Sequence, residues 1–409
     1  MKKFDAIIVG AGAAGSIAAL ELAKRGFKVI VLEKGPKVDE AKAHQRYRVL
    51  QGGVEVWLVE ALGGTTLVSL GNAVPVLLEE LKSLGIDVSH EIGELIHELK
   101  AAPLPSSFRG RGTKLFIDAC RQLKLEVNHA LKLINPKLCK NCRRCAAGCP
   151  NNAKWTALKA LNEAISYGAQ ILTSVADLKV RVQGNEARGV QFKHSGLLKE
   201  VYADTVILAA GPIGSPLILR SLGIEEAGRK LFVDIFVDVG APLPNVSLVD
   251  EVPMQVYVKL PKIMLSPHYT VFLQPYLSSK GVKIPSEDIM SIMVKIADSS
   301  RGEVLSENVI YKPLTKTDLR LLERGVKEAL QILEATGAEV GKAAVTFPRG
   351  AHPGGTAPIG EIVNRDLETE ISQLHVVDAS VLPKAPGAPP MLTIMALAKY
   401  LAKQLAQRS

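Results

Sequence analysis

Residues 4–33 constrain the fold of this chain more than any other stretch. The apolar run 6–9 has the length and β-branched content of a buried parallel strand, and it stops at the glycine-rich sequence Gly10–Ala11–Gly12–Ala13–Ala14–Gly15. A helix with an apolar stripe follows at once, and a second apolar run, 29–32, closes on Glu33. The stretch therefore predicts one complete βαβ unit.

The three glycines of this unit have different physical functions. Gly10 permits a tight turn, Gly12 lets the backbone approach a pyrophosphate, and Gly15 lets the helix pack closely on the strand. Glu33 is placed to accept hydrogen bonds from ribose hydroxyls, and its charge would repel a 2′-phosphate, which disfavours NADP. The unit predicts a site for FAD or NAD. Its expected contacts are Gly10, Gly12, Ala13, Ala14, Gly15, Glu33 and Lys34.

Length and composition limit the other possibilities. A chain of 409 residues with 47% hydrophobic residues can form one large α/β domain and a smaller one. No run approaches the ~18 apolar residues of a membrane span, and a first strand at Phe4 leaves no room for a signal peptide, so a cytoplasmic location is expected. The net charge of +9 suits an anionic partner or simply a basic surface, but it is not gathered into a tract typical of nucleic-acid binding.

Four of the five cysteines form the second informative stretch. Cys139, Cys142, Cys145 and Cys149 have the C-x₂-C-x₂-C-x₃-C-P spacing of bacterial ferredoxins. This spacing favours an iron–sulfur cluster, [4Fe–4S] before [3Fe–4S], with zinc as the minor alternative. Because no second run is present, either the fourth cysteine binds the same cluster, Cys120 supplies a ligand, or the cluster has three cysteine ligands.

The charges around the cysteines are all positive. No Asp or Glu occurs between Glu126 and Glu163. Cations near a thiolate-ligated cluster would stabilise it, and they could dock an acidic electron carrier such as a ferredoxin; a solvated basic face is the simpler interpretation. The cations are Lys132, Lys137, Lys140, Arg143, Arg144, Lys154 and Lys159.

The middle of the chain predicts a β-meander and a further strand. Runs at 180–182, 187–192 and 200–202 are separated by turn residues, and a strand at 205–210 runs into Gly211. This order resembles the two-dinucleotide-fold flavoproteins, which favours FAD over NAD. The resemblance places Val175 where backbone amide and carbonyl meet the adenine, and it adds Ala210 and Gly211 to the expected cofactor contacts.

Two further stretches are expected near the cofactor. Paired glycines and hydroxyls in Gly63–Gly64–Thr65–Thr66, followed by Asn72, suit a loop pressed against a ligand. Short β-rich runs and prolines between 236 and 340 predict a smaller antiparallel sheet facing the substrate, followed by an amphipathic helix at 318–336.

The C-terminal motifs resemble the glucose–methanol–choline (GMC) oxidoreductases. The chain matches H-x-x-G-T at 352–356, V-V-D-A-S-x-x-P at 376–383 and T-I-M-A-L-A at 393–398. Gly63–Thr66 and Gly211–Pro216 also match signatures of that family. The resemblance covers the flavin domain and leaves the substrate-facing part unmatched.

The resemblance implies a fold and a reaction. FAD would accept a hydride from a carbon bearing a hydroxyl, and His352 would be the catalytic base that takes the hydroxyl proton. A helix beginning near Leu392 would point its N-terminus at the flavin. The expected flavin contacts in this part are Asp378, Ala379, Pro390, Met391 and Leu392.

The chain also departs from the family. Most members have a second His or Asn where this sequence has Pro389, and proline can neither donate a hydrogen bond nor take a proton. The chain is shorter than typical members, so its substrate domain is reduced. Some GMC-type dehydrogenases, including bacterial sugar dehydrogenases, are similar in carrying an Fe–S cluster near a C-x₃-C-P element.

These observations predict an α/β fold with an α+β part. A Rossmann-like FAD domain with a β-meander spans 1–235 and 341–409, includes the cysteine-rich segment 136–156, and leaves 236–340 as the substrate domain. The expected function is dehydrogenation of a small alcohol or polyol, with electrons passed through the cluster to an external acceptor. The alternatives are a reductase fed by a ferredoxin-like donor, and a non-catalytic flavin or metal protein.

Overall fold

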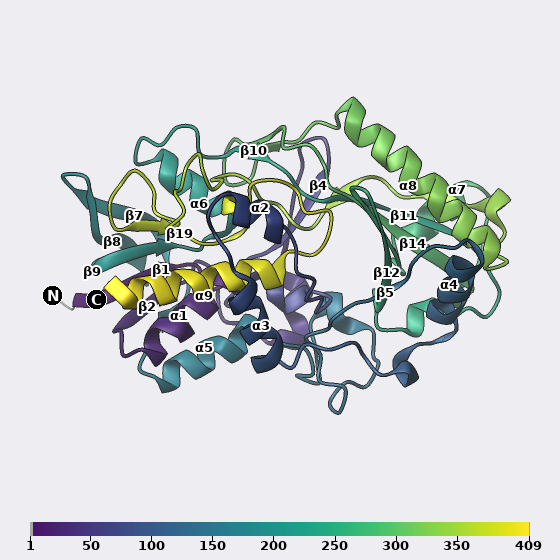
Figure 1. Ribbon diagram of the computed structural model, residues 1–409, viewed down its shortest axis with the longest axis horizontal. Helices are drawn as coiled ribbons and strands as arrows, with labels where there is room; N and C mark the ends of the chain where they lie inside the picture. Colours follow the sequence, from purple (N-terminus) through teal and green to yellow (C-terminus); the bar gives the residue numbers. More distant parts are fainter. Residues whose placement is uncertain (1–2, 409) are drawn as a thin grey trace.

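A seven-stranded sheet carries the N-terminal βαβ unit in the computed structural model, which describes residues 3–408. Strand β1 (Lys3–Val9) pairs in parallel with β2 (Val29–Leu32), and α1 (Ala13–Lys24) connects them (Figure 1). The strand order is β6-β2-β1-β9-β8-β7, with β19 also paired to β9. The predicted βαβ unit and Rossmann-like sheet are thus confirmed.

Strand β9 (Leu197–Leu208) joins the meander to the parallel sheet. It pairs antiparallel with β8 (Glu186–His194), which in turn pairs with β7 (Ala176–Gln183), and it pairs parallel with β1. The sequence predicted two separate strands at 200–202 and 205–210, and this was wrong. Val201 and Tyr202 pair with β8 while Val206 and Ile207 pair with β1, so both sheets share one continuous strand.

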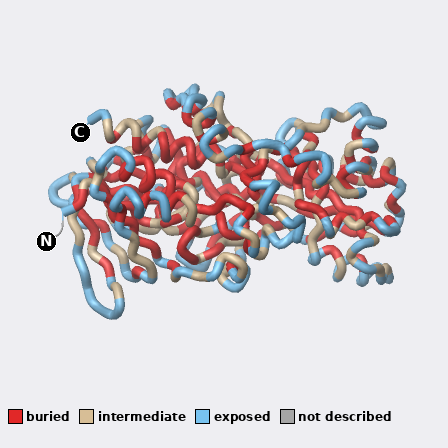
Figure 2. The backbone as a smooth tube through the Cα atoms, turned by 90° about the horizontal axis from the view of Figure 1, so that it is seen from below, coloured by how far each residue is buried: buried red, intermediate tan, exposed pale blue. Residues whose placement is uncertain are grey.

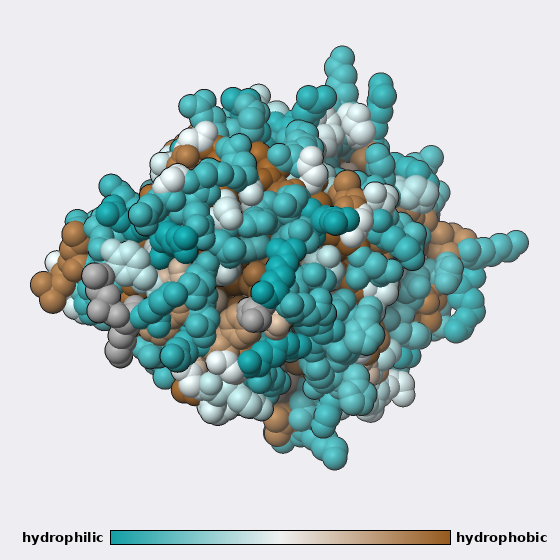
Figure 3. All heavy atoms as spheres, turned by 60° about the vertical axis from the view of Figure 1, so that its left-hand side comes forward, coloured by the Kyte–Doolittle hydropathy of each residue, from teal (hydrophilic) through white to brown (hydrophobic). Residues whose placement is uncertain are grey.

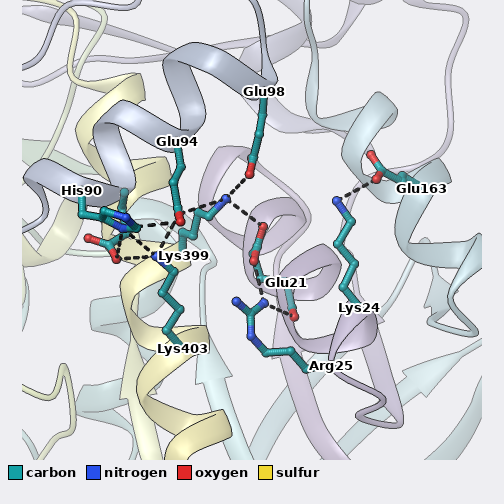
Figure 4. Close-up of polar contacts among 10 residues, drawn as sticks. Glu21, Lys24, Arg25, His90, Glu94, Glu98, Glu163, Lys399 and Lys403 are labelled. Atoms are coloured by element: carbon teal, nitrogen blue, oxygen red, sulfur yellow. Dashed lines mark hydrogen bonds and ion pairs between the residues drawn. The ribbon is translucent and has the colours of Figure 1, made fainter.

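Four helices pack together on one side of this sheet. Helix α1 contacts α5 (Ala157–Ser166) and α9 (Met391–Arg408), and α9 contacts α3 (Ser89–Glu98). Figure 4 shows the ion pairs between them: the Lys399 ammonium on α9 lies 2.5 Å from Glu98 and 3.3 Å from Glu21. Lys399 is only 3% exposed, so it is a buried cation that joins α1, α3 and α9.

A nine-stranded mixed sheet forms the other half of the molecule. Its order is β3-β4-β18-β11-β14-β13-β12-β5, with β17 on β11. The strands are β3 (Tyr47–Leu50), β4 (Glu55–Val59), β5 (Asn128–His129), β11 (Ile235–Pro242), β12 (Val256–Leu260), β13 (Ile263–Pro267), β14 (Ile289–Ile296), β17 (Ala344–Val345) and β18 (Arg349–Gly350). The predicted antiparallel sheet is present at its centre, but five of these strands come from outside 236–340. The domain boundaries themselves stay a prediction.

Helix α8 (Lys316–Ala335) covers one face of the nine-stranded sheet together with α4 (Arg111–Gln122). Thr315 caps α8 by accepting from the Asp318 amide, while the Asp318 carboxylate accepts from the Thr315 amide. The helix predicted at 318–336 is therefore confirmed, two residues earlier at its start. The opposite face of the sheet turns toward the first sheet and carries the residues described below.

The remaining elements are short, and two of them, β6 and β19, belong to the seven-stranded sheet. A three-stranded sheet has the order β10-β15-β16. The bounds are α2 (Leu78–Ser83), α6 (Gly211–Arg220), α7 (Leu273–Ser279), β6 (Gln170–Leu172), β10 (Arg229–Leu231), β15 (Gly302–Val304), β16 (Ile310–Tyr311) and β19 (Leu374–Val376).

Two main clusters of buried apolar residues form the core. One surrounds the seven-stranded sheet and the other lies between the nine-stranded sheet and α4 and α8. Figure 2 shows buried backbone running through both halves, with exposed backbone at the loops. The end of the molecule in Figure 3 is mostly hydrophilic, with small separate hydrophobic areas. Among the helices of residues 3–408, none is both long enough and apolar enough to cross a membrane.

Lys399→Met tests how much the buried cation stabilises the fold. Methionine keeps helix propensity in α9 but leaves Glu21, Glu94 and Glu98 without their shared cation, so we expect the free energy of unfolding to fall by about 1–3 kcal/mol. The control is Lys3→Met, which removes a pair with Asp204 whose two side chains are 69% and 54% exposed and should cost about 0–1 kcal/mol. Urea unfolding of both variants measures the difference; equal effects would contradict a stabilising role for the buried cation.

Candidate active site

The glycine turn after β1 leaves an open space beside Gly12. A Cβ on Gly10, whose φ is +104°, would lie 2.2 Å from the Ala209 carbonyl oxygen, and one on Gly15 would lie 2.0 Å from the Gly10 carbonyl oxygen. A Cβ on Gly12 would meet no atom within 4 Å. Gly10 and Gly15 are therefore required for packing, whereas Gly12 borders the space at the N-terminus of α1 that a pyrophosphate would fill.

Glu33 is held at the end of β2 by backbone donors. Its carboxylate accepts from the amides of Ala11 (2.8 Å) and Gly35 (2.7 Å), and burial raises its pKa to about 7. Its carbonyl oxygen accepts from the Val175 amide at 3.0 Å. The Val175 amide is thus already paired within the chain, and only its carbonyl is free to meet an adenine, contrary to the sequence-based expectation. Lys34, next along the chain, pairs with Glu60 and Glu307.

The glycine–hydroxyl loop lies against the glycine turn. A Cβ on Gly64 would be 3.4 Å from the Gly12 Cα atom, so these two segments lie side by side although they are distant in sequence. Thr66 donates to the Gly63 carbonyl (2.6 Å) and accepts from the Ala157 amide (3.0 Å), and Thr65 accepts from the Val59 amide (3.3 Å). Thr66 thus uses its hydroxyl as donor and as acceptor within the protein, whereas the exposed Thr65 hydroxyl only accepts and can still donate to a ligand.

Asn72, at the end of this loop, is also paired within the protein. Its side-chain oxygen accepts from the Lys132 ammonium at 2.5 Å, and its amide nitrogen lies 3.5 Å from the Met254 sulfur. One donor and one acceptor site of the Asn72 side chain, and its backbone, stay available for a flavin contact.

Asp378 joins the C-terminal motif to the start of α6. One carboxylate oxygen accepts from the Gly211 amide (2.9 Å) and the Ser215 hydroxyl (2.6 Å), and the other accepts from the Ser380 amide (2.8 Å). Burial raises the pKa of Asp378. These bonds bring Ala210, Gly211, Asp378 and Ala379 to one place, although the sequence separates the two pairs by 167 residues.

Helix α9 begins at Met391, directly after Pro390, as the motif predicts. The Thr393 hydroxyl accepts from the Val76 amide and donates to the Val76 carbonyl, both at 3.0 Å. The first turn of α9, with Pro390, Met391 and Leu392, is thereby fixed against the segment that follows Asn72.

His352 follows β18 and is oriented by a buried carboxylate. Its Nδ1 atom lies 3.2 Å from Asp234, whose other oxygen accepts from the Gly387 amide at 2.8 Å. Asp234 has a left-handed φ of 51°, a conformation that costs most residues about 1–2 kcal/mol but that Asp tolerates. Burial raises the pKa of Asp234 to about 7. Burial and the nearby Lys295 cation lower the pKa of His352 well below its ordinary value.

The sequence analysis missed Asp234 and the charged residues beside it. On the sheet face near His352, Phe236 of β11 pairs with Lys295 of β14 and with Arg349 of β18. Asp238 receives a hydrogen bond from Arg349 (3.0 Å) and lies 2.8 Å from His268. Two acids, Asp234 and Asp238, in the otherwise apolar run 231–239 were the available signal.

The four predicted metal-binding cysteines line one cavity. Ile134, Ala153 and Val252 complete its apolar lining. Across residues 3–408, the sole group of three possible ligand atoms within 4.8 Å of one another is His90, Glu91 and Glu94, so the cysteine sulfurs are spread more widely. A tetrahedral zinc site needs sulfurs ~3.8 Å apart, so this spacing does not favour a single zinc ion. Cys120 lies on α4, in the apolar cluster between the nine-stranded sheet and the helices α4 and α8, and burial raises its pKa to about 12.

Two buried lysines lie near this cavity and donate to the loop 63–72, which contacts Gly12. The Lys154 ammonium donates to the carbonyls of Cys145 (2.9 Å), Leu67 (2.9 Å) and Ser69 (2.7 Å). The Lys132 ammonium donates to Asn72 and to the carbonyls of Leu70 and Pro253. Lys154 therefore joins the cysteine cavity to the loop 63–72, and Lys132 joins the same loop to Pro253, close enough to Cys145 for their charges to interact.

Comparison with known proteins assigns the chain to a family. Residues 5–233 match the family described as FAD dependent oxidoreductase, and residues 308–398 match the family described as GMC oxidoreductase. The chain belongs to the GMC oxidoreductases. Its flavin domain is therefore an FAD-dependent oxidoreductase domain, and the resemblance inferred from the C-terminal motifs is confirmed.

Several individual proteins resemble this GMC oxidoreductase along nearly its whole length. An uncharacterized protein of Methanocaldococcus jannaschii is 34% identical over 98% of this chain and 100% of its own. A long-chain-alcohol oxidase of Arabidopsis thaliana is 25% identical over 98% of this chain and 66% of its own. The crystal structure of a pyridoxine 4-oxidase from Mesorbium loti is 17% identical, covers 98% of both chains and has a TM-score of 0.75, which shows the same fold.

Gly12→Ala tests whether the open space beside Gly12 holds the cofactor. Because the added methyl meets no protein atom, we expect the apoprotein to keep its stability within about 1 kcal/mol while FAD affinity falls at least ~10-fold. Gly93→Ala, on α3, is the matched control, since its methyl also meets nothing within 4 Å and lies on another helix. FAD titration by fluorescence and urea unfolding of the apoproteins give the two numbers. Unchanged FAD affinity in Gly12→Ala would place the pyrophosphate elsewhere.

Proposed function

We propose that this GMC oxidoreductase is an FAD-dependent dehydrogenase that oxidises a hydroxyl-bearing substrate and passes electrons through an iron–sulfur cluster to an external carrier. The observation that carries the proposal is the contact between three segments. The loop 63–72 lies against Gly12 on one side and is hydrogen-bonded through Lys154 to Cys145 on the other. A flavin and a cluster held there would be neighbours.

The residues present fit FAD. The space beside Gly12 accepts a pyrophosphate, Glu33 still has acceptor capacity toward ribose hydroxyls, and Asp378 fixes the loop expected near the ribityl chain. FAD supplies, when bound, an acceptor for a hydride at flavin N5. The protein has to bind the substrate, orient its C–H bond and remove the hydroxyl proton.

His352 is suited to remove that proton. An ionised Asp234 accepts from Nδ1–H, which leaves Nε2 unprotonated and able to act as the base. The lowered pKa of His352 keeps the imidazole neutral under ordinary conditions. The proteins named as a long-chain-alcohol oxidase and a pyridoxine 4-oxidase support an alcohol as the substrate class.

The cysteine cavity fits an anionic cluster better than a zinc ion. Among the described residues no three of its sulfurs lie within 4.8 Å of one another, whereas a single tetrahedral ion needs sulfurs ~3.8 Å apart. The buried Lys154 lines the cavity, and the buried Lys132 is close enough to Cys145 for their charges to interact. A thiolate-ligated cluster carries negative charge that such cations would offset. Arg143 and Arg144 line the outer side, where an acidic carrier such as a ferredoxin could dock.

Pro389 supports a second candidate function. Without a partner for His352 at that position, the flavin could instead reduce an unsaturated substrate with electrons supplied to the cluster by a reduced ferredoxin. Anaerobic stopped-flow mixing with a panel of alcohols and polyols separates the two. Flavin bleaching by an alcohol supports the dehydrogenase, and bleaching by reduced ferredoxin alone supports the reductase. A non-catalytic flavin or metal protein would show neither.

Anaerobically purified protein is expected to contain iron and acid-labile sulfide. Cys145→Ser should lower the iron and sulfide contents by more than half, because it removes a ligand from the cavity. Cys120→Ala should leave both contents unchanged, since Cys120 lies in the apolar cluster beside α4 and α8. Metal analysis and the visible spectrum measure this. Zinc without sulfide in the wild-type protein would refute the iron–sulfur cluster and favour the structural alternative.

The rate of flavin reduction by an alcohol should fall as the pH drops through about 7. Asp234 binds a proton there, and a neutral Asp234 can donate to Nδ1 and leave the proton of the imidazole on Nε2, where the base is needed. If protonation of His352 alone controlled the rate, its lowered pKa would move the fall in rate to a more acidic pH. Stopped-flow measurement of the flavin reduction rate at a series of pH values checks this. A fall in rate that occurs only well below pH 6.5 would show that Asp234 does not control the proton transfer.

Asp234→Asn tests the same link without a change of pH. The Gly387 amide should hold the Asn oxygen, which turns the Asn NH₂ toward His352 Nδ1 and places the imidazole proton on Nε2. We expect a loss of ~10²–10⁴-fold in the rate of reduction at every pH. Asp118→Asn, on the exposed surface of α4, is the control that should keep the wild-type rate. A rate within ~3-fold of wild type for Asp234→Asn would exclude the proposed orientation of His352.

A further inference from the structure

Five lysines among residues 3–408 are buried, and Lys295 differs from the others in its partners. Each of four has two or three oxygen partners at its ammonium group. Lys295 has a single hydrogen bond, 3.3 Å long, to the Asp234 carbonyl. The four with more partners are Lys132, Lys154, Lys312 and Lys399.

An ammonium group has three N–H donors, so Lys295 has donors to spare in a place without bulk water. Burial lowers the pKa of Lys295, and three carboxylates at longer range, those of Asp234, Asp298 and Asp238, oppose that shift and support its charged form. None of them forms an ion pair with it within 4.0 Å in the described part of the chain. A buried cation with unused donors is costly, and such a group is retained where a ligand completes its hydrogen bonds.

The position of Lys295 is at the candidate base. It lies on β14, with its ammonium 4.7 Å from the centre of the Phe236 ring. Its hydrogen-bond acceptor, Asp234, is the residue that orients His352. Burial, and after it the charge of Lys295, lower the pKa of His352. Lys295 and His352 thus share Asp234 as a neighbour.

The loop that carries Pro389 packs on the same place. The Gly387 amide donates to Asp234, and a Cβ on Gly387 would be 3.0 Å from the backbone nitrogen of Ala297, two residues after Lys295. The position where most family members have a His or Asn is therefore beside the C-terminal end of β14. Proline offers no donor there, and Lys295 does.

We propose that Lys295 is a catalytic residue that binds the hydroxyl oxygen of the substrate and so replaces the donor that Pro389 lacks. This rests on the proposed dehydrogenase function. The hydroxyl proton goes to Nε2 of His352, the C–H bond breaks with its electron pair leaving as a hydride that bound FAD would accept as the two-electron oxidant, and the C–O bond becomes a carbonyl. Lys295 keeps its proton and donates a hydrogen bond to the oxygen while negative charge develops on it.

This role follows from the chemistry of the base. An imidazole with a lowered pKa is a weak acceptor for the proton of an alcohol. A fixed cation at the oxygen stabilises the forming alkoxide and makes the transfer possible, and it acts strongly because Lys295 is only 2% exposed. A lysine supplies both the donor and the full positive charge.

Binding of acetate and of acetamide to the FAD-loaded protein tests the inference without turnover. The two probes have the same shape, and only acetate carries the negative charge of an alkoxide. The change in flavin absorbance on binding gives the affinity for each probe. We expect the wild-type protein to bind acetate at least ~10-fold more tightly than acetamide. Equal affinities, or no binding of acetate, would overturn the proposal whatever the variants do.

Two variants assign the effect to Lys295. Lys295→Met should lose the preference for acetate and lower the rate of flavin reduction by an alcohol ~10²–10³-fold with a smaller change in half-saturation, as expected for a lost donor to a developing oxyanion. Lys295→Gln keeps a donor, removes only the charge and serves if Lys295→Met does not bind FAD; it should also lose the preference. Lys327→Met, on the exposed side of α8, is the control and should behave like the wild-type protein.

The outcomes separate this inference from the function on which it rests. If alcohols reduce the wild-type flavin, His352→Ala abolishes the reduction, and both Lys295 variants keep the wild-type rate, Lys295 is not the donor and the dehydrogenase proposal stands. If acetate binds through Lys295 but no alcohol reduces the flavin, the anion site is real and the dehydrogenase proposal fails.

Discussion

The close approach of backbone segments around the glycine turn is the constraint on which the site depends. Gly15 lies on Gly10, Gly10 lies on the backbone at Ala209, and Gly64 lies on Gly12, with no room for a side chain at the first two contacts. These contacts join the first strand, the end of β9 and the loop 63–72. Because Asp378 then ties the start of α6 to the C-terminal motif, segments from four parts of the chain converge on one binding site.

Buried charge distinguishes the substrate-facing half of the molecule. The face of β11, β14 and β18 near His352 holds Asp234, Asp238, Lys295 and Arg349, where apolar residues would be the ordinary choice. Asp238 is satisfied by Arg349 and His268, and Asp234 by His352 and Gly387. Arg349 keeps an unpaired Nε–H among the described contacts. Such a face costs stability unless ligands complete it, which is the usual compromise at an active site.

Buried charge is also found beside the cysteines. Lys132 and Lys154 are buried and each donates three hydrogen bonds, to backbone oxygens and, for Lys132, also to the Asn72 side chain, so they do not need a ligand to be stable. Their charge nevertheless remains near the cysteine cavity. The sequence showed the cations around the cysteines as a basic stretch, but it did not distinguish these two, which are internal, from Arg143 and Lys140, which are exposed.

By itself the sequence determined what depends on residues close together in the chain. The glycine turn, the strand periods, the cap of α8 and the spacing of the cysteines are local patterns, and each predicts its element or its ligand type from a few neighbouring residues. The GMC motifs added the positions of His352 and Asp378 within the flavin domain.

Only the tertiary structure decided which groups meet. The nine-stranded sheet joins β3, β4, β17 and β18 to the strands β11–β14, and β9 is shared by the meander and the parallel sheet. The Val175 amide bonds to Glu33, and Asp234 lies with His352 and Lys295. All these contacts join residues far apart in sequence. No local pattern encodes such pairs, because each is selected by the burial and hydrogen bonding of the whole fold.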